Sequence, residues 1–282
     1  MKLFKLFSYL TLQIEPTREC NLNCKICMRK NLTNKTGHLS FENFKKIIDK
    51  FNFNYVALHG WGEPLLNPEI FEMVRYAESK GISASLITNG TLIKESILDE
   101  IFDSNLSEIA FGIYELDSLI KRSSKLESLI EMRRELKSKR PKIYLDITIY
   151  KDNYDEIEEM IKIAKDVGVD AVTLHRLFNV YKVDPDVKYI SGEEEKTLFS
   201  KINRLKKELK LEIFLPKPHS LPCNIVKYSI FVTWDGQVTP CCFLPEHSFN
   251  TIFNLSMKDL ILYQREFIEN MRNHPICSKC RW

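Results

Sequence analysis

The chain has 282 residues, with 41 basic and 38 acidic side chains and a net charge of +3. A chain of this length can form one large domain with a small appendage. Because basic and acidic residues are interspersed, the composition argues against a nucleic-acid-binding protein, which would carry a basic face.

The first ten residues are mostly apolar, yet they lack the features of a secretory signal peptide. Lys5 interrupts the apolar run, and no cleavage site of small residues follows it. No apolar run in the sequence is long enough to span a bilayer. We therefore expect a cytoplasmic protein that does not bind membranes.

Most of the chain alternates between strand-like and helix-like segments. Apolar runs predict six strands, at residues 10–17, 55–59, 82–88, 109–114, 143–150 and 171–174. Helical spacing of apolar residues predicts helices between them, at residues 41–51, from 68 onward, 93–101, 116–136 and 157–167. Six strand–helix units in order favour parallel strands with right-handed crossovers. Six units are too few for a closed eight-fold barrel, so the predicted fold is α/β, a partial, open (β/α)6 TIM-like barrel.

The rhythm of the sequence changes after Arg176. The following segments predict, in order, a charged helix at 193–209, a linker with three prolines at 216–222, a hairpin at 228–239 that turns at Asp235-Gly236, and a last helix at 257–271. We therefore expect a boundary near Leu215. The barrel then occupies residues 1–215, and a small α+β module occupies residues 216–282.

The eight cysteines fall into two groups. Three lie near the start of the chain and five in its last quarter: Cys20, Cys24, Cys27, Cys223, Cys241, Cys242, Cys277 and Cys280. Disulfide frameworks belong to small secreted domains. Tight cysteine spacings in a chain of this kind indicate metal binding instead.

The first group, Cys20-x3-Cys24-x2-Cys27, lies in the loop that follows the first predicted strand. Parallel barrels build their active sites at the carboxyl ends of their strands. Three thiolates can hold three irons of a [4Fe–4S] cubane and leave the fourth iron open. A structural zinc site or a ferredoxin cluster would normally take four ligands.

This spacing resembles the signature of the radical S-adenosylmethionine (SAM) superfamily, and the resemblance extends from about Leu10 to Cys280. It implies that SAM binds the open iron and is cleaved reductively to a 5′-deoxyadenosyl radical, which takes a hydrogen atom from the substrate. The residue before the third cysteine is usually aromatic in this family and lies near the adenine. Here it is Ile26, whose aliphatic side chain can still cover a purine.

Further segments resemble SAM-binding positions of the family. Gly60-Trp61-Gly62-Glu63 resembles the Gly-Gly-Glu motif, with Trp61 in place of a glycine. The resemblance implies that Gly60 and Gly62 allow close backbone approach and that Glu63 supplies a charge for the SAM ammonium, provided that Trp61 points outward. A plain turn is the alternative. The other candidates are the Thr88-Asn89-Gly90 turn and the strand residues Thr148, His175 and Arg176.

The second group of cysteines can supply all the ligands of one metal site. Its four members with fitting spacing are Cys223, Cys241, Cys277 and Cys280, and four thiolates suit either a cubane or zinc. Together with the first motif, this pattern resembles the SPASM/twitch module of radical SAM enzymes. A full SPASM domain has further cysteines after the final pair, so we expect the shorter twitch type with one auxiliary cluster. The ligand pattern is similar to that of 2-deoxy-scyllo-inosamine dehydrogenase, and Cys242 is surplus.

The sequence therefore predicts an oxidoreductase with two [4Fe–4S] clusters and SAM. The resemblance implies a reducing partner such as a ferredoxin or flavodoxin. The substrate stays open between a peptide, a protein and a small alcohol, and the auxiliary cluster is expected to accept an electron from it. The alternatives are a non-catalytic iron–sulfur electron carrier and a zinc-stabilised binding protein.

Overall fold

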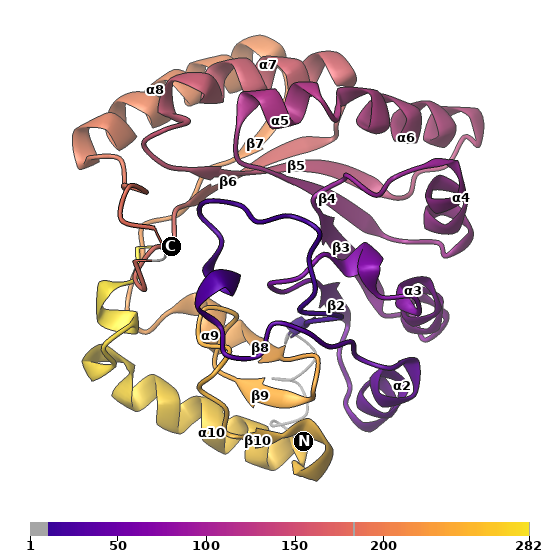
Figure 1. Ribbon diagram of the computed structural model, residues 1–282, viewed down its shortest axis with the longest axis vertical. Coiled ribbons are helices and arrows are strands. Elements are labelled where there is room, and N and C mark those ends of the chain that lie inside the picture. Colours follow the sequence, from indigo (N-terminus) through magenta and orange to yellow (C-terminus); the bar gives the residue numbers. More distant parts are fainter. Residues whose placement is uncertain (1–10, 183, 282) are drawn as a thin grey trace.

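The computed structural model describes residues 11–182 and 184–281. A ten-stranded sheet curves around a central space, and helices cover its outer face (Figure 1). The strands lie in the order β10-β9-β8-β1-β2-β3-β4-β5-β6-β7, so that β10 and β7 form the edges. The fold is thus α/β with a partial barrel, as the alternation of segments predicted.

The strands are short, and the first seven pair in parallel in chain order. Their bounds are β1 (Thr11–Ile14), β2 (Tyr55–Leu58), β3 (Ser83–Thr88), β4 (Glu108–Ile113), β5 (Lys142–Ile149), β6 (Ala171–Arg176), β7 (Glu212–Phe214), β8 (Ser229–Val232), β9 (Gln237–Thr239) and β10 (Asn250–Thr251). The predicted start of the first strand at Leu10, the amino-terminal segment and Trp282 lie outside the described residues.

Helices follow most strands and pack against the outer face of the sheet. Their bounds are α2 (Phe41–Lys50), α3 (Ile70–Ser79), α4 (Glu95–Asp103), α5 (Leu116–Ile120), α6 (Ser123–Glu135), α7 (Ile157–Val167), α8 (Gly192–Leu209), α9 (Asn224–Tyr228) and α10 (Met257–Asn270). The single helix predicted over 116–136 is two helices, because the chain bends at Lys121-Arg122. Ser40 caps α2 through the Asn43 amide, and Gly168 ends α7 with a positive φ of 95°.

Alternate residues along the strands separate the core from the interior of the barrel. On β1, Leu12 and Ile14 are fully buried in the apolar core, whereas Gln13 faces a cavity. On β5, Asp146 and Thr148 face that cavity. Polar and small inward residues do not fill the barrel as the branched residues of a closed barrel do. The interior therefore holds a cavity.

The sheet differs from the predicted six-unit barrel at both ends. A seventh parallel strand, β7, follows the charged helix and pairs with β6. The first strand of the predicted hairpin, β8, pairs with β9 as expected but also pairs in parallel with β1, with Thr11 opposite Ser229. Strands from both sides of Leu215 belong to the same sheet. The domain boundary expected near Leu215 therefore stays a prediction.

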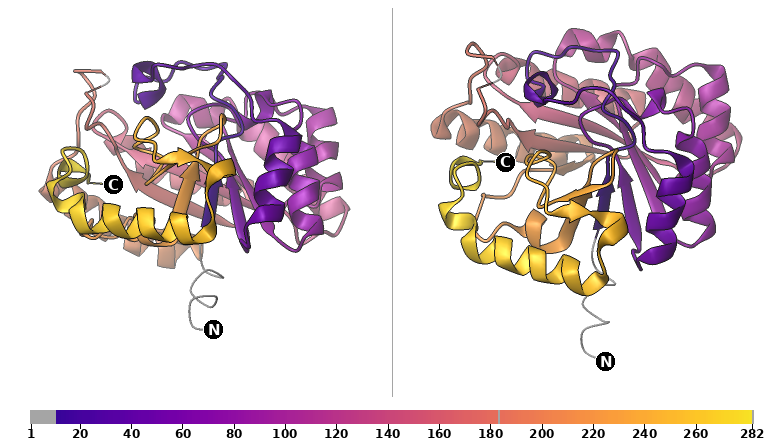
Figure 2. Two further views of the ribbon diagram at one scale, coloured as in Figure 1. Left: turned by 90° about the horizontal axis from the view of Figure 1, so that it is seen from below. Right: turned by 60° about the horizontal axis from the view of Figure 1, so that its bottom comes forward.

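The loop after β1 lies over the end of the barrel at which the parallel strands finish, and α10 runs along the outside of β8 and β9 (Figure 2). The loop carries a short 3-10 helix, η1 (Met28–Asn31). In the part of the chain that the structure describes, no helix combines the length and the apolar character needed to cross a membrane.

Candidate active site

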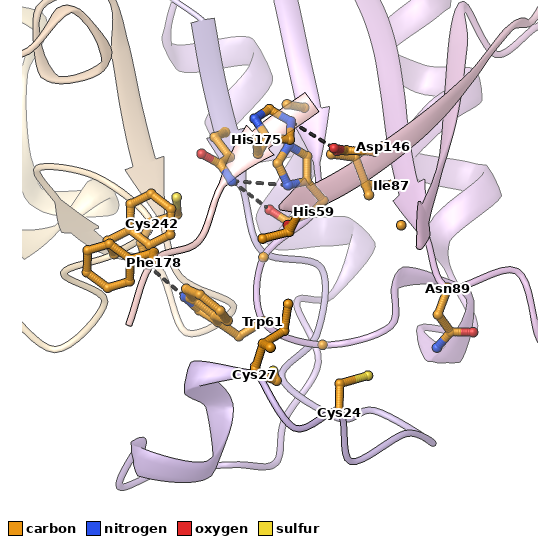
Figure 3. Close-up of a pocket in the computed structure, with 18 of the residues that line it drawn as sticks. Cys24, Cys27, His59, Trp61, Ile87, Asn89, Asp146, His175, Phe178 and Cys242 are labelled. Carbon is orange, nitrogen blue, oxygen red and sulfur yellow. Dashed lines mark hydrogen bonds and ion pairs between the residues drawn. The ribbon is translucent and has the colours of Figure 1, made fainter. Parts of the chain in front are cut away.

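A cavity of about 630 Å³ occupies the interior of the barrel. Its wall is formed by the loop after β1, by the carboxyl ends of β2 to β6, and by residues around α9 and the start of β8. Figure 3 shows side chains from these elements converging on it. Parallel barrels place their active sites at this end of the strands, so the cavity is the candidate active site.

Cys20, Cys24 and Cys27 all line this cavity. A backbone hydrogen bond from Cys27 N to Cys24 O (3.1 Å) tightens the loop between them. Burial raises the pKa of Cys24, and it raises that of Cys27 to about 11, with the neighbouring thiols adding to both shifts. Metal binding would deprotonate these thiols. Three sulfur donors on one short loop, at the edge of a large cavity, fit a cubane with one open iron.

The Gly60–Gly62 turn packs directly on the segment that leads into the cysteine loop. A Cβ at Gly62 would lie 2.2 Å from the carbonyl oxygen of Thr17, and one at Gly60 would lie 2.6 Å from Cγ of Glu15. Glu63 N also donates to the carbonyl oxygen of Glu19 at 2.8 Å. Glycine is therefore required sterically at both positions, and the turn and the cysteine loop are held in register.

Trp61, between these glycines, does not point outward as the sequence analysis required. Its side chain lines the cavity, its Nε1 donates to the carbonyl oxygen of Cys242 at 2.7 Å, and its ring lies 6.0 Å from that of Phe243. The backbone amide of Trp61 donates to the buried Glu15 carboxylate at 3.1 Å, and that carboxylate pairs with Arg18 at 2.8 Å. Trp61 therefore connects the barrel to the carboxyl-terminal segment.

Glu63 is buried, with 2% of its surface exposed. Its carboxylate accepts hydrogen bonds from the Thr88 hydroxyl (2.6 Å), the Asn89 amide (2.7 Å) and the Leu65 amide (3.2 Å). Burial raises its pKa, and these hydrogen bonds oppose the rise. The carboxylate thus joins the Gly60–Gly62 turn to the turn after β3, a connection that the sequence did not indicate.

The Thr88-Asn89-Gly90 turn forms part of the cavity wall. Asn89 donates to the side chain of Asn21 in the cysteine loop at 2.9 Å. Gly90 has a positive φ of 73°, and a Cβ there would lie 2.7 Å from the ring of Phe111. This turn at the end of β3 therefore stabilises the position of the cysteine loop.

The remaining predicted SAM contacts divide into two kinds. Ile26 and Thr148 line the cavity, and Ile26 packs with Tyr150 and Leu177 in a small apolar cluster. Arg176 also borders the cavity, but its guanidinium binds both carboxylate oxygens of Glu195 on α8, at 2.6 and 3.0 Å. Its donors thus fix the barrel to α8, and its contact with SAM stays a prediction.

Four further polar side chains line the cavity wall: Gln13, His59, Asp146 and His175. Nε2 of Gln13 lies 3.2 Å from Nδ1 of His59. Nε2 of His175 lies 2.8 Å from Oδ1 of Asp146, and Figure 3 shows this pair close to His59. Burial lowers the pKa of His59 to about 4. Burial also lowers that of His175, but Asp146 outweighs this effect and raises it. Of these four, only His175 was predicted from the sequence. The alternation of polar residues along β5 was the available signal for Asp146.

The second group of cysteines lines a separate small cavity of about 30 Å³. Its wall contains all four predicted ligands, Cys223, Cys241, Cys277 and Cys280. Cys242 lines the main cavity instead, and Figure 3 shows it apart from Cys24 and Cys27, beyond Trp61.

Burial raises the pKa of Cys241 well above its usual value and that of Cys277 to about 11. Among the described residues, no three histidine, cysteine or acidic side chains lie close enough together to hold a single metal ion. The four sulfurs around one cavity fit the donor set of a cubane.

Comparison with known proteins agrees with this geometry. The family model of the radical SAM superfamily matches residues 14–186, and that of the SPASM iron–sulfur cluster-binding domain matches residues 223–281. The tungsten-containing aldehyde ferredoxin oxidoreductase cofactor-modifying protein of Pyrococcus furiosus is 24% identical over 95% of this chain and 86% of its own.

Two solved structures share the fold. Streptococcus suis SuiB bound to S-adenosylmethionine has a TM-score of 0.73 and 17% identity, over 95% of this chain and 69% of that chain. Native anSMEcpe with bound AdoMet and a peptide has a TM-score of 0.71 and 19% identity, over 97% and 86% of the two chains. The two family models indicate [4Fe–4S] clusters and SAM as cofactors. The chain belongs to the radical SAM superfamily of enzymes and carries a carboxyl-terminal SPASM domain.

Proposed function

We propose that this radical SAM enzyme oxidises a substrate held in the 630 Å³ cavity and passes one electron to a second cluster. One observation carries the proposal. The main cavity is bordered by Cys20, Cys24 and Cys27 and shares part of its wall with the small cavity around the second group of cysteines. A substrate between the two groups is within reach of both.

The proposed ligands of the first cluster are Cys20, Cys24 and Cys27. When bound, the cluster and SAM supply a carbon radical that takes a hydrogen atom from the substrate. The proposed SAM contacts are Ile26, Gly60, Gly62, Glu63, Thr88, Asn89, Thr148 and Arg176, all of which line the main cavity. Glu63, Thr88 and Asn89 form one hydrogen-bonded unit, so each of them also holds the other two in position.

The proposed ligands of the second cluster are Cys223, Cys241, Cys277 and Cys280. Phe178, Ile225 and Phe243 line both cavities, and the rings of Phe178 and Phe243 stack at 4.0 Å. A single layer of side chains thus divides the substrate from this cluster. Such a thin apolar layer excludes water yet keeps the path for an electron short.

The relatives suggest the range of substrates and partners. One is named for modifying a cofactor, and another is named a PqqA peptide cyclase. These names support a peptide or protein of cofactor maturation as the substrate, and a small alcohol is the other candidate. We infer a ferredoxin or flavodoxin as reductant and no role in nucleic-acid binding. All eight cysteines are free of disulfides, which suits a reducing cytoplasm.

The test begins with the protein reconstituted without oxygen. We expect about eight irons per chain, as two cubanes require, and formation of 5′-deoxyadenosine from SAM after reduction with dithionite. Cys24→Ser should abolish this product and remove about half of the iron. Cys280→Ser, in the second group, should lose a similar share of iron but still form 5′-deoxyadenosine.

The electron-acceptor role has its own readout. With any substrate that the wild type converts, Cys280→Ser should release 5′-deoxyadenosine without the oxidised product. Normal product formation by a variant that lacks the second cluster would refute that role. Failure of the reduced wild type to cleave SAM would refute the proposed function as a whole.

A further inference from the structure

Neither the proposed cluster ligands nor the proposed SAM contacts account for the polar group formed by Gln13, His59, Asp146 and His175. These side chains come from β1, the end of β2, β5 and β6, and all four line the cavity inside the barrel. Figure 3 shows His59, Asp146 and His175 together. The Asp146 side chain is 14% exposed and that of His175 is 25% exposed. Buried polar groups are costly unless they are paired. These four form two pairs, Gln13 with His59 and Asp146 with His175, and all four border the cavity in which the proposed substrate lies.

The hydrogen bonds define what this group offers to a ligand. The Gln13 amide donates to Nδ1 of His59, so the neutral ring of His59 carries its proton on Nε2. Asp146 uses Oδ1 for His175. These two contacts engage Nδ1 of His59 and Oδ1 of Asp146, so they do not use Nε2 of His59 or Oδ2 of Asp146. The cavity wall therefore presents one donor and one carboxylate acceptor.

We propose that His59 and Asp146 bind the hydroxyl group of an alcohol substrate and that Asp146 accepts its proton during oxidation to a carbonyl. A hydroxyl group both donates and accepts, so it satisfies Asp146 and His59 together. His175 and Gln13 are positioning residues, because they fix the orientation of Asp146 and the tautomer of His59. This inference rests on the proposed function and names the substrate class for the same cavity.

The oxidation balances with the cofactors already proposed. The hydrogen atom on the carbon that bears the hydroxyl group goes to the SAM-derived radical, which forms the methyl group of 5′-deoxyadenosine. One electron then leaves the substrate carbon for the second cluster, and the hydroxyl proton goes to Oδ2 of Asp146. The product is a carbonyl compound. Because a carbonyl that still carries this proton is a strong acid, a carboxylate paired with His175 is basic enough to take it.

Other substrate groups match this wall less well. A carboxylate would face the charge of Asp146. An ammonium group would meet the N–H of His59 with no acceptor to offer it. A hydrocarbon would leave Nε2 of His59 and Oδ2 of Asp146 without partners. A site with unpaired buried polar atoms discriminates strongly against such a ligand. The hydroxyl group is thus the favoured partner.

The first test separates this group from the SAM site. SAM affinity of the reconstituted protein is measured for Asp146→Asn and His59→Gln, with Tyr144→Phe as the control. Tyr144 lies on the same strand as Asp146, two residues earlier, and it does not line the cavity. We expect SAM affinity within about twofold of wild type for all three. A tenfold loss in Asp146→Asn would overturn the proposal, because it would assign Asp146 to SAM binding.

The second test uses three hydroxyl compounds as probes: myo-inositol, 2-deoxy-scyllo-inosamine and the tripeptide Gly-Ser-Gly. At least one should raise formation of 5′-deoxyadenosine above the rate without substrate, and Gly-Ala-Gly should not. With an active probe deuterated at the carbinol carbon, deuterium should appear in 5′-deoxyadenosine. Asp146→Asn should lower kcat for the carbonyl product by about 10²-fold or more, with a smaller change in KM.

The outcomes distinguish this inference from the function on which it rests. SAM cleavage with no response to any hydroxyl probe, or an equal response to Gly-Ala-Gly, would overturn the alcohol assignment and leave the radical SAM function intact. Full carbonyl formation by Asp146→Asn would overturn the role of Asp146 as proton acceptor. No SAM cleavage in the reduced wild type would instead refute the function itself.

Discussion

Replacing Glu63 by alanine tests how the two turns beside the cysteine loop create a SAM site. The carboxylate is buried and accepts from the Thr88 hydroxyl at 2.6 Å and from the Asn89 amide at 2.7 Å. It also accepts from Leu65 N at 3.2 Å. Without the carboxylate, the Thr88 hydroxyl and the Asn89 amide lose their acceptor, so the end of β3 is no longer fixed to the Gly60–Gly62 turn.

The size of the effect follows from these bonds. A hydrogen bond to a charged group contributes about 1.5–3 kcal/mol, and a buried donor left without a partner costs about 1–3 kcal/mol. We therefore expect Glu63→Ala to lower the free energy of unfolding by about 3–5 kcal/mol. SAM affinity should fall by about tenfold or more, because charge and geometry are lost together. Both clusters should still assemble, since no cysteine is changed.

A matched variant separates the two contributions. Thr88→Val removes one of the three hydrogen bonds and keeps the carboxylate charge. If Glu63 acts through the position of the turns, Thr88→Val should also weaken SAM binding, by less than Glu63→Ala. Iron analysis, thermal unfolding and equilibrium binding of SAM to the reconstituted proteins measure these effects. Unchanged SAM affinity in Glu63→Ala would refute the reasoning, because the turn would then be merely structural.

Two further substitutions test the cysteine assignment and the glycine turn. Cys242→Ser should keep its full iron content and Cys241→Ser should lose about half of it; the reverse result would transfer the ligand role to Cys242. Gly62→Ala should destabilise the protein by about 1–3 kcal/mol or more and weaken SAM binding, because its Cβ would lie 2.2 Å from a backbone oxygen. Gly192→Ala, in open space at the start of α8, is the control and should be neutral or stabilising; equal stability of the two variants would contradict the steric argument.

The repeated strand–helix units could be predicted because each depends on local periodicity. The apolar residues of α7 recur at helical spacing, and Gly168 ends the helix where a left-handed residue is needed. The strand β7 could not be found in this way. It has three residues, Glu212–Phe214, and only the middle one is buried, so it lacks the apolar run that marks a strand.

The candidate site was predictable only where its chemistry lies in short motifs. The cysteine spacings and the two glycine-containing turns are local, and the structure brings them to one cavity. The polar wall is different, because Gln13 and Asp146 lie 133 positions apart in the numbering and share no motif. Their meeting depends on the register of the whole sheet, which no local pattern specifies.

The pairing of β8 with β1 explains how the carboxyl-terminal segment comes to border the main cavity. The two strands are parallel, with Thr11 opposite Ser229 and Ile14 opposite Val232. Cys20 comes after β1, whereas Cys223 comes before β8, separated from it only by α9. Because β1 and β8 are parallel, Cys20 and Cys223 lie beyond opposite ends of this pair of strands. Residues from both ends line the main cavity. The carboxyl-terminal segment thus completes the wall of the barrel, and Phe178, Ile225 and Phe243 line both the main cavity and the small cavity around its cysteines.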